Sequence, residues 1–516
     1  MLFTSLSFLL FLVLLFAVYY IVPYRFRWVL LLVFSAVFYA FAGLSGFIFI
    51  GITIISTYTA TRLIGSVYEK QTDYLKNTEG LSRQDKKEYK EKSKRKMRLF
   101  LVPCLIINFG ILALLKYILV GKGFLGIGLI LPMGISFYTF QTMGYLIDVY
   151  RGKVSAEKNI FKMALFTSYF PLLVQGPISD YKKLTETLYT PAPFSAKNFL
   201  FGFERVLWGY FKKLVIADRL IAAVTTITGD PSEYYGAYAF LGMILYAIQL
   251  YADFTGGIDI TIGISQMLGI RLQENFDRPY FSKNISEYWR RWHITLGEWF
   301  KEYLFYPISV AKPMLKLSKF SREHFGDAIG KRLPVYISTI VVWFTTGVWH
   351  GRGLRFMVWG LLNCFIILVS QELSPLYKKF HGKFPTLKDT SSYKAFEITR
   401  TFLMMGCLKM FDCYADVTTT FRMFASFFTG GQYKELLTGG LFKVGISAAD
   451  YIVVLVGVLI IFTVSMKQRK FAIREKLFTK PMVIQCIVIA LLFVVIIVFG
   501  AYGVGYDSKQ FIYNQF

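Results

Sequence analysis

The chain has 516 residues, of which 55% are hydrophobic and 18% aromatic, and its mean hydropathy is +0.48. This composition excludes an ordinary soluble domain and indicates a protein that lies in lipid. Its 58 Lys and Arg against 32 Asp and Glu give a formal net charge of +26. These basic residues cluster between apolar runs and do not alternate with aromatic residues on a polar face, which indicates membrane topology and argues against nucleic acid binding.

Apolar runs of roughly the length that crosses a bilayer recur along the whole chain. Examples are Leu2–Val22, Leu99–Leu115, Val335–Trp349, Tyr451–Val464 and Val483–Phe499. They predict an all-α polytopic membrane protein with about twelve to fourteen crossings. We expect residues 1–516 to form a single transmembrane domain.

The most basic segment, 69–98, contains eleven Lys or Arg residues. We expect it to form a solvated helical hairpin in the cytoplasm, because basic residues between spans stay on that side. Counting crossings from there places both termini outside. The loop Gly229–Tyr235, which contains Asp230 and Glu233 but no Lys or Arg, falls outside by the same count.

The run Ala252–Ile270 is interrupted by Asp253, Asp259 and a Gly pair. Such residues are tolerated at membrane depth where the backbone is buried in protein or lines a wet cavity, so we expect a broken or re-entrant helix there. The following region, 271–334, is expected to be re-entrant or interfacial, because its part Tyr288–Ile308 is too charged to face lipid and too aromatic for a loose loop.

His350 is the strongest candidate for chemistry among the four histidines, because His324 and His381 lie in polar basic segments. If its helix leaves the cytoplasmic face near Leu333, a rise of about 1.5 Å per residue puts His350 roughly 25 Å into the bilayer. An ionisable residue at that depth is a functional candidate by default. The structural alternative is a neutral histidine hydrogen-bonded between helices.

Three glycines flank His350 and favour the functional interpretation. Gly347, Gly351 and Gly353 remove side-chain bulk, which would let a substrate approach the imidazole. A hydroxyl acceptor needs a base, and a neutral imidazole supplies one worth about 10²- to 10⁴-fold in rate. Since no Ser or Cys pairs with it in a recognised motif, we expect direct transfer without an acyl-enzyme.

His293 lies in the aromatic and basic segment Tyr288–Trp299. Interpreted as one helix, this segment carries an apolar stripe of Trp289, Trp292, Leu296, Trp299 and Tyr303. An interfacial helix anchored by Trp and Arg explains much of the pattern, and a functional His293 is compatible with it. Arg290 or Arg291 could meet an anionic donor.

Other catalytic patterns are missing from the sequence. It has no Gly-rich phosphate loop, no GxSxG and no HExxH. Its five cysteines are scattered without metal-ligand spacing, so they predict neither a disulfide framework nor a metal site.

Six short segments follow one another in an order that is more specific than any one of them. They are Leu131–Gln141, Gln175–Ile178, Asp253–Gly256, Glu274–Tyr280, Tyr288–His293 and Trp349–Gly351. Together they resemble the membrane-bound O-acyltransferase family, in its bacterial branch of alginate O-acetyltransferase, peptidoglycan O-acetyltransferase and teichoic acid D-alanyl transferase. The resemblance implies a ring of tilted transmembrane helices with re-entrant helices around a central tunnel.

The resemblance also implies the roles of the site residues. His350 would be the catalytic histidine of the family and His293 its second functional histidine. The matching segments add Trp349, Asp253 and Asn275 to Arg290 and Arg291 as candidate substrate-binding residues.

The implied activity is transfer of an acetyl group from a cytoplasmic thioester, either acetyl-coenzyme A or an acyl carrier protein, across a bacterial plasma membrane for O-acetylation of an extracellular polysaccharide. No permanently bound cofactor is expected. D-alanyl transfer toward teichoic acid is the alternative within the family. A secondary transporter with a proton relay through Asp253, Asp259 and His350 is the alternative of another class.

The acceptor side departs from the family pattern. Where alginate-type members usually show Phe-Phe-Arg-Ala, this chain has the segment Lys409–Tyr414. The longest outer stretch, Phe411–Ile446, is too short for a Ser-His-Asp acetyltransferase domain, and its phenylalanines suggest a helix on the membrane or against a partner. We therefore expect, besides membrane lipid, a separate extracytoplasmic acetyltransferase or an accepting peptide as partner.

Overall fold

The computed structural model describes residues 1, 3–119, 123–124, 127–128, 131–190, 193–469 and 472–502. In these ranges the chain is helical apart from loops and one antiparallel pair of two-residue strands, β1 (Gly123–Phe124) and β2 (Ile127–Gly128). It forms two compact units, one of Met1–Phe203 with Thr261–Gln273 and one of Glu204–Ile260 with Glu274–Phe516. The predicted all-α class is confirmed.

The first unit is built from helices of the N-terminal part of the chain. Their bounds are α1 (Leu6–Ile21), η1 (Tyr24–Phe26), α2 (Arg27–Ala40), α3 (Gly46–Asn77), α4 (Arg83–Ala113), η2 (Leu114–Leu119), α5 (Ile135–Arg151), α6 (Ile160–Ser168), α7 (Phe170–Gln175) and α8 (Tyr181–Leu188). Two further helices, α9 (Ala196–Tyr210) and α11 (Ala237–Met267), pass from one unit into the other.

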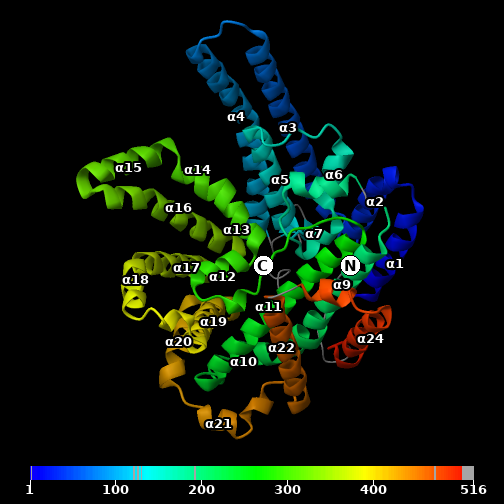
Figure 1. Ribbon diagram of the computed structural model, residues 1–516, viewed down its shortest axis with the longest axis vertical. Coiled ribbons are helices and arrows are strands. Elements are labelled where there is room, and N and C mark those ends of the chain that lie inside the picture. Colours follow the sequence, from blue (N-terminus) through cyan, green and yellow to red (C-terminus); the bar gives the residue numbers. More distant parts are fainter. Residues whose placement is uncertain are drawn as a thin grey trace. The chain divides into compact units, whose positions relative to one another are not determined.

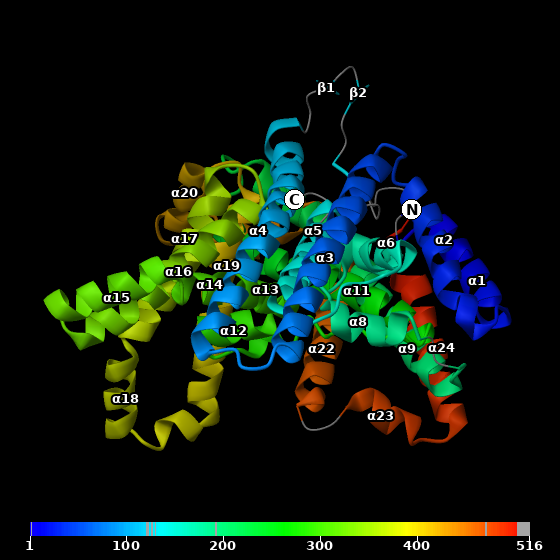
Figure 2. The ribbon, with the colours of Figure 1, turned by 90° about the horizontal axis from the view of Figure 1, so that it is seen from above.

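Helices α3 and α4 form a long antiparallel hairpin, seen in blue in Figures 1 and 2. The turn between them ends in a capping box, in which Ser82 Oγ accepts from Asp85 N–H at 3.1 Å and the Asp85 carboxylate accepts from Ser82 N–H at 3.2 Å. The side chains around this turn are largely exposed. The predicted helical hairpin over 69–98 is therefore confirmed.

The second unit contains the remaining helices. Their bounds are η3 (Phe211–Ala217), α10 (Asp218–Gly229), η4 (Pro279–Phe281), α12 (Ile285–Arg291), α13 (Ile294–Phe300), η5 (Lys301–Phe305), α14 (Tyr306–Ser309), α15 (Lys312–Phe325), α16 (Asp327–His350), α17 (Leu354–Glu372), α18 (Ser374–Lys383), η6 (Leu387–Asp389), α19 (Ser391–Cys413), α20 (Val417–Thr429), α21 (Tyr433–Leu437), η7 (Gly440–Lys443), α22 (Ala448–Gln468), α23 (Ile473–Phe478) and α24 (Met482–Phe499). Figure 1 shows α15, α16 and α17 lying side by side.

Six helices in the described part of the chain are long and apolar enough to cross a membrane. They are Gly46–Asn77, Arg83–Ile118, Ala237–Met267, Leu354–Glu372, Ala448–Gln468 and Met482–Phe499. Leu6–Ile21 and Ile160–Gln175 are apolar but shorter. The protein is thus a multi-pass membrane protein, and the larger number of crossings, the central tunnel and the membrane position of residues 271–334 stay predictions.

Helix α11 corrects one prediction. The run expected to be broken around Asp253 and Asp259 is a continuous helix of 31 residues. It needs no break, because each carboxylate is bound by a basic side chain from the preceding helices: Lys213 binds Asp253, and Lys212 binds Asp259.

The glycines of this run serve close packing of two helices. A methyl group on Gly209 would come within 2.6 Å of the backbone oxygen of Gly256, and one on Gly256 within 2.9 Å of the backbone oxygen of Gly209. The end of α9 and the middle of α11 therefore touch backbone to backbone, with an ion pair on each side of the contact.

Candidate active site

The segment predicted as one amphipathic helix is broken at His293. Helix α12 ends at Arg291 and α13 begins at Ile294, while His293 adopts the left-handed conformation with φ 49° and ψ 53°. The single-helix interpretation is therefore wrong, and the stripe from Trp289 to Tyr303 is not continuous.

A distant backbone segment causes the break. Asp277 donates its N–H to Arg291 O and Asn275 accepts from Ile294 N–H, both at 3.0 Å, and Phe276 forms an antiparallel bridge with Trp292. A left-handed residue other than glycine costs about 1 kcal/mol or more, so these bonds must hold the turn.

Asn275 determines which nitrogen of His293 carries the proton. The Asn275 side-chain oxygen accepts from the N–H of Thr295 at 3.1 Å and from its hydroxyl at 2.9 Å, and lies 3.3 Å from His293 Nδ1. Because a backbone N–H can only donate, the amide orientation of Asn275 is fixed, and Nδ1 must be the protonated nitrogen. Nε2 therefore carries the lone pair. Burial lowers the pKa of His293 to about 3, which keeps the ring neutral at physiological pH.

His350 is the last residue of α16, and its ring is partly exposed. The interpretation of the flanking glycines as room for substrate is wrong for two of them. A methyl group on Gly347 would overlap the backbone of Phe356, and one on Gly351 would overlap its ring, so these glycines allow α17 to pack closely. Only Gly353 faces open space, with φ at 101°.

Trp349 links the two histidines. Its buried ring contacts His350 with centroids 4.9 Å apart and His293 with centroids 6.2 Å apart, both at steep interplanar angles. The ring of Phe254 closes another side of His293 at 5.1 Å. The structure thus brings together His293, Asn275, Trp349 and His350 in one aromatic site, in which His350 is partly exposed and the other three are buried.

Trp359 is a site residue that the sequence interpretation missed. Its ring lies 4.4 Å from that of His350, and it contacts Trp289 at 5.8 Å. Its buried Nε1, like the buried Nδ2 of Asn275, donates to none of the described residues. A buried indole N–H usually finds a partner, so both atoms are candidates for donating to a substrate oxygen. The sequence held no signal for Trp359 beyond its place in an apolar run.

The two predicted arginines differ in their surroundings. Arg290 is exposed, whereas Arg291 pairs with Glu287 at 2.7 Å one turn earlier on α12. Arg290 is therefore the more available of the two for an anionic ligand.

Asp253 lies in a fully buried ion cluster. Lys213 Nζ stands 2.6 Å from Asp253 and 2.7 Å from Asp218. With its carboxylate bound in this way, Asp253 stabilises the second unit, and its predicted contact with substrate stays untested.

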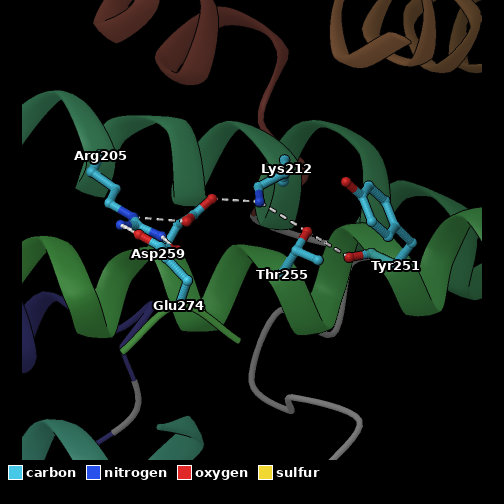
Figure 3. A network of polar contacts seen from close by, with 6 residues as sticks. All are labelled: Arg205, Lys212, Tyr251, Thr255, Asp259 and Glu274. Carbon is cyan, nitrogen blue, oxygen red and sulfur yellow. Dashed lines mark hydrogen bonds and ion pairs between the residues drawn. The ribbon is translucent and has the colours of Figure 1, made fainter. Parts of the chain in front are cut away.

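A second cluster lies farther along α11 and is drawn in Figure 3. Asp259 accepts from Arg205 at 2.9 Å and from Lys212 at 2.5 Å. Arg205 also forms a bidentate salt bridge with Glu274. Lys212 further donates to Thr255 at 2.8 Å. Carboxylates that are held this firmly by cations argue against a proton relay through Asp253 and Asp259.

Within the described ranges, no group of three or more His, Cys, Asp or Glu is placed to hold a metal ion.

Comparison with known proteins places this site in a family context. The sequence model of MBOAT, the membrane-bound O-acyltransferase family, matches residues 73–415. "Probable alginate O-acetylase AlgI" of Azotobacter vinelandii is 33% identical over 70% of this chain and 66% of its own length. The peptidoglycan O-acetyltransferase of Helicobacter pylori is 32% identical over 56% of this chain and 58% of its own, and the teichoic acid D-alanyltransferase of Bacillus subtilis 25% identical over 48% and 61%. The chain thus spans somewhat less than two thirds of these relatives.

Proposed function

Because the chain belongs to the membrane-bound O-acyltransferase family, we propose that it moves an acetyl group from a cytoplasmic thioester donor across the membrane for O-acetylation of an extracellular polysaccharide. The observation that carries the proposal is that His293 and His350 both contact the ring of one buried tryptophan, Trp349. The protein would act in the plasma membrane of a bacterium.

In this proposal His350 is the general base. The acceptor hydroxyl oxygen attacks the thioester carbonyl carbon while the imidazole takes the hydroxyl proton. The carbon–sulfur bond then breaks, and the proton passes to the leaving thiolate. No covalent acyl-enzyme is needed, because donor and acceptor meet at one site.

His293 would serve as a hydrogen-bond acceptor for the substrate. Its neutral ring carries the lone pair on Nε2, which can accept from a hydroxyl and orient it toward His350. The buried donors Trp359 Nε1 and Asn275 Nδ2 would bind substrate oxygens, and Trp349 would form the wall between the two imidazoles.

The donor would be acetyl-coenzyme A or an acyl carrier protein, whose phosphate groups suit exposed Arg290. Acetyl is favoured over D-alanyl, because the acetyltransferase relatives are 32% and 33% identical to this chain and the D-alanyl relative 25%. D-alanyl transfer toward teichoic acid is the second candidate.

The test uses purified protein in vesicles that hold labelled acetyl-coenzyme A inside and a small hydroxyl acceptor outside. We expect label on the outer acceptor with the wild type. His350→Ala should lose at least about a hundredfold in rate while inserting normally, since a lost base removes rate and not core packing. His293→Ala should lose rate as well, because it removes the acceptor that orients the hydroxyl.

His324→Ala is the control, because His324 is exposed at the end of α15 and should be dispensable. A normal rate in His350→Ala would refute the assignment of the base. Replacing the donor with a D-alanyl thioester distinguishes the two family activities.

We further propose that the acetyl group passes to a separate extracytoplasmic acetyltransferase or an accepting peptide. The aromatic stretch of α20 supports this only in part, because Met423 is buried against Met243 and Tyr414, while Phe421 and Phe428 are exposed. Full acetylation of the exported polymer by cells that contain this protein alone would contradict the proposal.

A further inference from the structure

Lys409 is a buried lysine whose partners are aromatic rings. It lies on α19 with only 4% of its surface exposed. Its Nζ stands 3.6 Å from the centroid of the Trp292 ring, 5.0 Å from that of Tyr280 and 5.7 Å from that of Tyr288. It also donates to the Tyr280 hydroxyl at 2.9 Å. Lys212 and Lys213, by contrast, are each bound by carboxylates.

The three rings beside this amine are nearly parallel to one another. Trp292 lies nearly parallel to Tyr288 at 15° and to Tyr280 at 27°, with centroids 5.6 and 6.1 Å apart. Tyr280 is also attached to α11, because its hydroxyl donates to the backbone oxygen of Ala247 at 2.6 Å. Burial lowers the pKa of Lys409 well below its ordinary value. In either charge state, the contact of the amine with the ring face and its hydrogen bond to Tyr280 help to fix the position of Trp292.

Trp292 is the residue immediately before His293. Its backbone pairs with Phe276, and its ring packs edge-on against the Phe276 ring at 5.0 Å. The left-handed turn at His293 therefore depends on two attachments: the hydrogen bonds of Asn275 on one side and the clamped Trp292 ring on the other.

We propose that Lys409 is a positioning residue, which clamps Trp292 and so holds His293 in the left-handed turn where Asn275 fixes its tautomer. In this proposal Lys409 contacts the Trp292 ring and acts on His293 through it. The consequence for rate rests on the acyltransferase function proposed above. The consequence for the turn itself does not.

The matched variants are Lys409→Met, Lys409→Arg and Lys394→Met. Methionine keeps the length of lysine without the amine, and arginine keeps N–H donors over the ring. Lys394 lies on the same α19 and donates to the backbone oxygen of Asp389. We expect Lys409→Met to lower kcat about tenfold with little change in the KM for the donor, since losing roughly 1.4 kcal/mol of positioning is tenfold in rate. Lys409→Arg should retain most of the rate, and Lys394→Met all of it.

A second measurement is independent of activity. Diethyl pyrocarbonate modifies accessible neutral histidines, and mass spectrometry reports each site separately. We expect His293, which is 2% exposed, to be protected in the wild type while exposed His324 reacts. In Lys409→Met, His293 should become several-fold more reactive, and in Lys409→Arg it should stay protected.

The outcomes separate the two proposals. A wild type without transfer activity defeats the proposed function, while the reactivity of His293 still tests the clamp. Protected His293 and unchanged kcat in Lys409→Met overturn the clamp. If Lys409→Met does not purify, Lys409→Arg decides: a folded arginine variant with reactive His293 overturns the proposal, and one with protected His293 supports it.

Discussion

The state of His293 makes the stability of the protein depend on pH. In the folded chain its pKa is lowered to about 3, whereas in the unfolded chain it would bind a proton near pH 6.5. Between these values the unfolded state binds more protons, so stabilisation that is fully present above about pH 6.5 is lost as the pH falls toward 3.

We predict that this one group removes about 3 kcal/mol of stability by roughly pH 4. Carboxylates titrate in the same window, so the measured quantity is a difference between variants. The thermal unfolding midpoint of the wild type in detergent should fall more steeply between neutral pH and pH 4 than that of His293→Gln. His324→Gln should follow the wild type. Equal slopes for wild type and His293→Gln would show that His293 is not buried as a neutral ring.

At the scale of single residues, the sequence identified side chains that the structure brings together, but not the residues that hold them in place. His293 and His350 could be predicted, because histidines are rare here and stand beside Trp and Gly. The left-handed turn at His293 could not, because it is made by backbone atoms of Asn275 and Asp277 with no local signal. Trp359 and Lys409 were missed because their partners come from other helices.

Among the elements, α11 shows how paired charges permit a continuous helix. Asp253 and Asp259 in an apolar run suggest a break only if their partners are unknown. The partners, Lys212 and Lys213, occupy consecutive positions of the π-helix η3, and each pairs with a carboxylate of α11. The sequence predicts buried charges in this helix but not the cations that bind them.

We predict that Lys213→Met destabilises the protein by about 3–5 kcal/mol, because it leaves the buried carboxylates of Asp253 and Asp218 without their shared cation. The measurement is the thermal midpoint and the monodisperse fraction of detergent-solubilised protein. Lys183→Met, on an exposed position of α8, should change stability by no more than about 0.5 kcal/mol. A Lys213→Met variant as stable as Lys183→Met would contradict a structural role for the cluster.

For the whole molecule, the charge distribution predicts the orientation in the membrane. With residues 69–98 in the cytoplasm, a cysteine placed at exposed Lys87 should be unreactive toward an impermeant thiol reagent in intact cells and reactive after lysis. A cysteine at exposed Ser232, in the loop assigned to the outside, should react in intact cells. Both variants need a Cys486→Ser background, because Cys486 is exposed. Labelling of Lys87→Cys in intact cells would show that residues 69–98 face outward and would contradict the predicted orientation.

The α3–α4 hairpin also has a practical consequence for imaging this protein. A membrane protein of 59.4 kDa offers little mass outside the detergent micelle for aligning particles in electron microscopy. Here two helices of 32 and 31 residues meet at an exposed turn, and such turns tolerate inserted domains. A helical fiducial protein inserted between Asn77 and Leu81 would continue both helices and so be rigidly connected to the membrane protein. The graft should stop before Ser82, because the capping box with Asp85 starts α4.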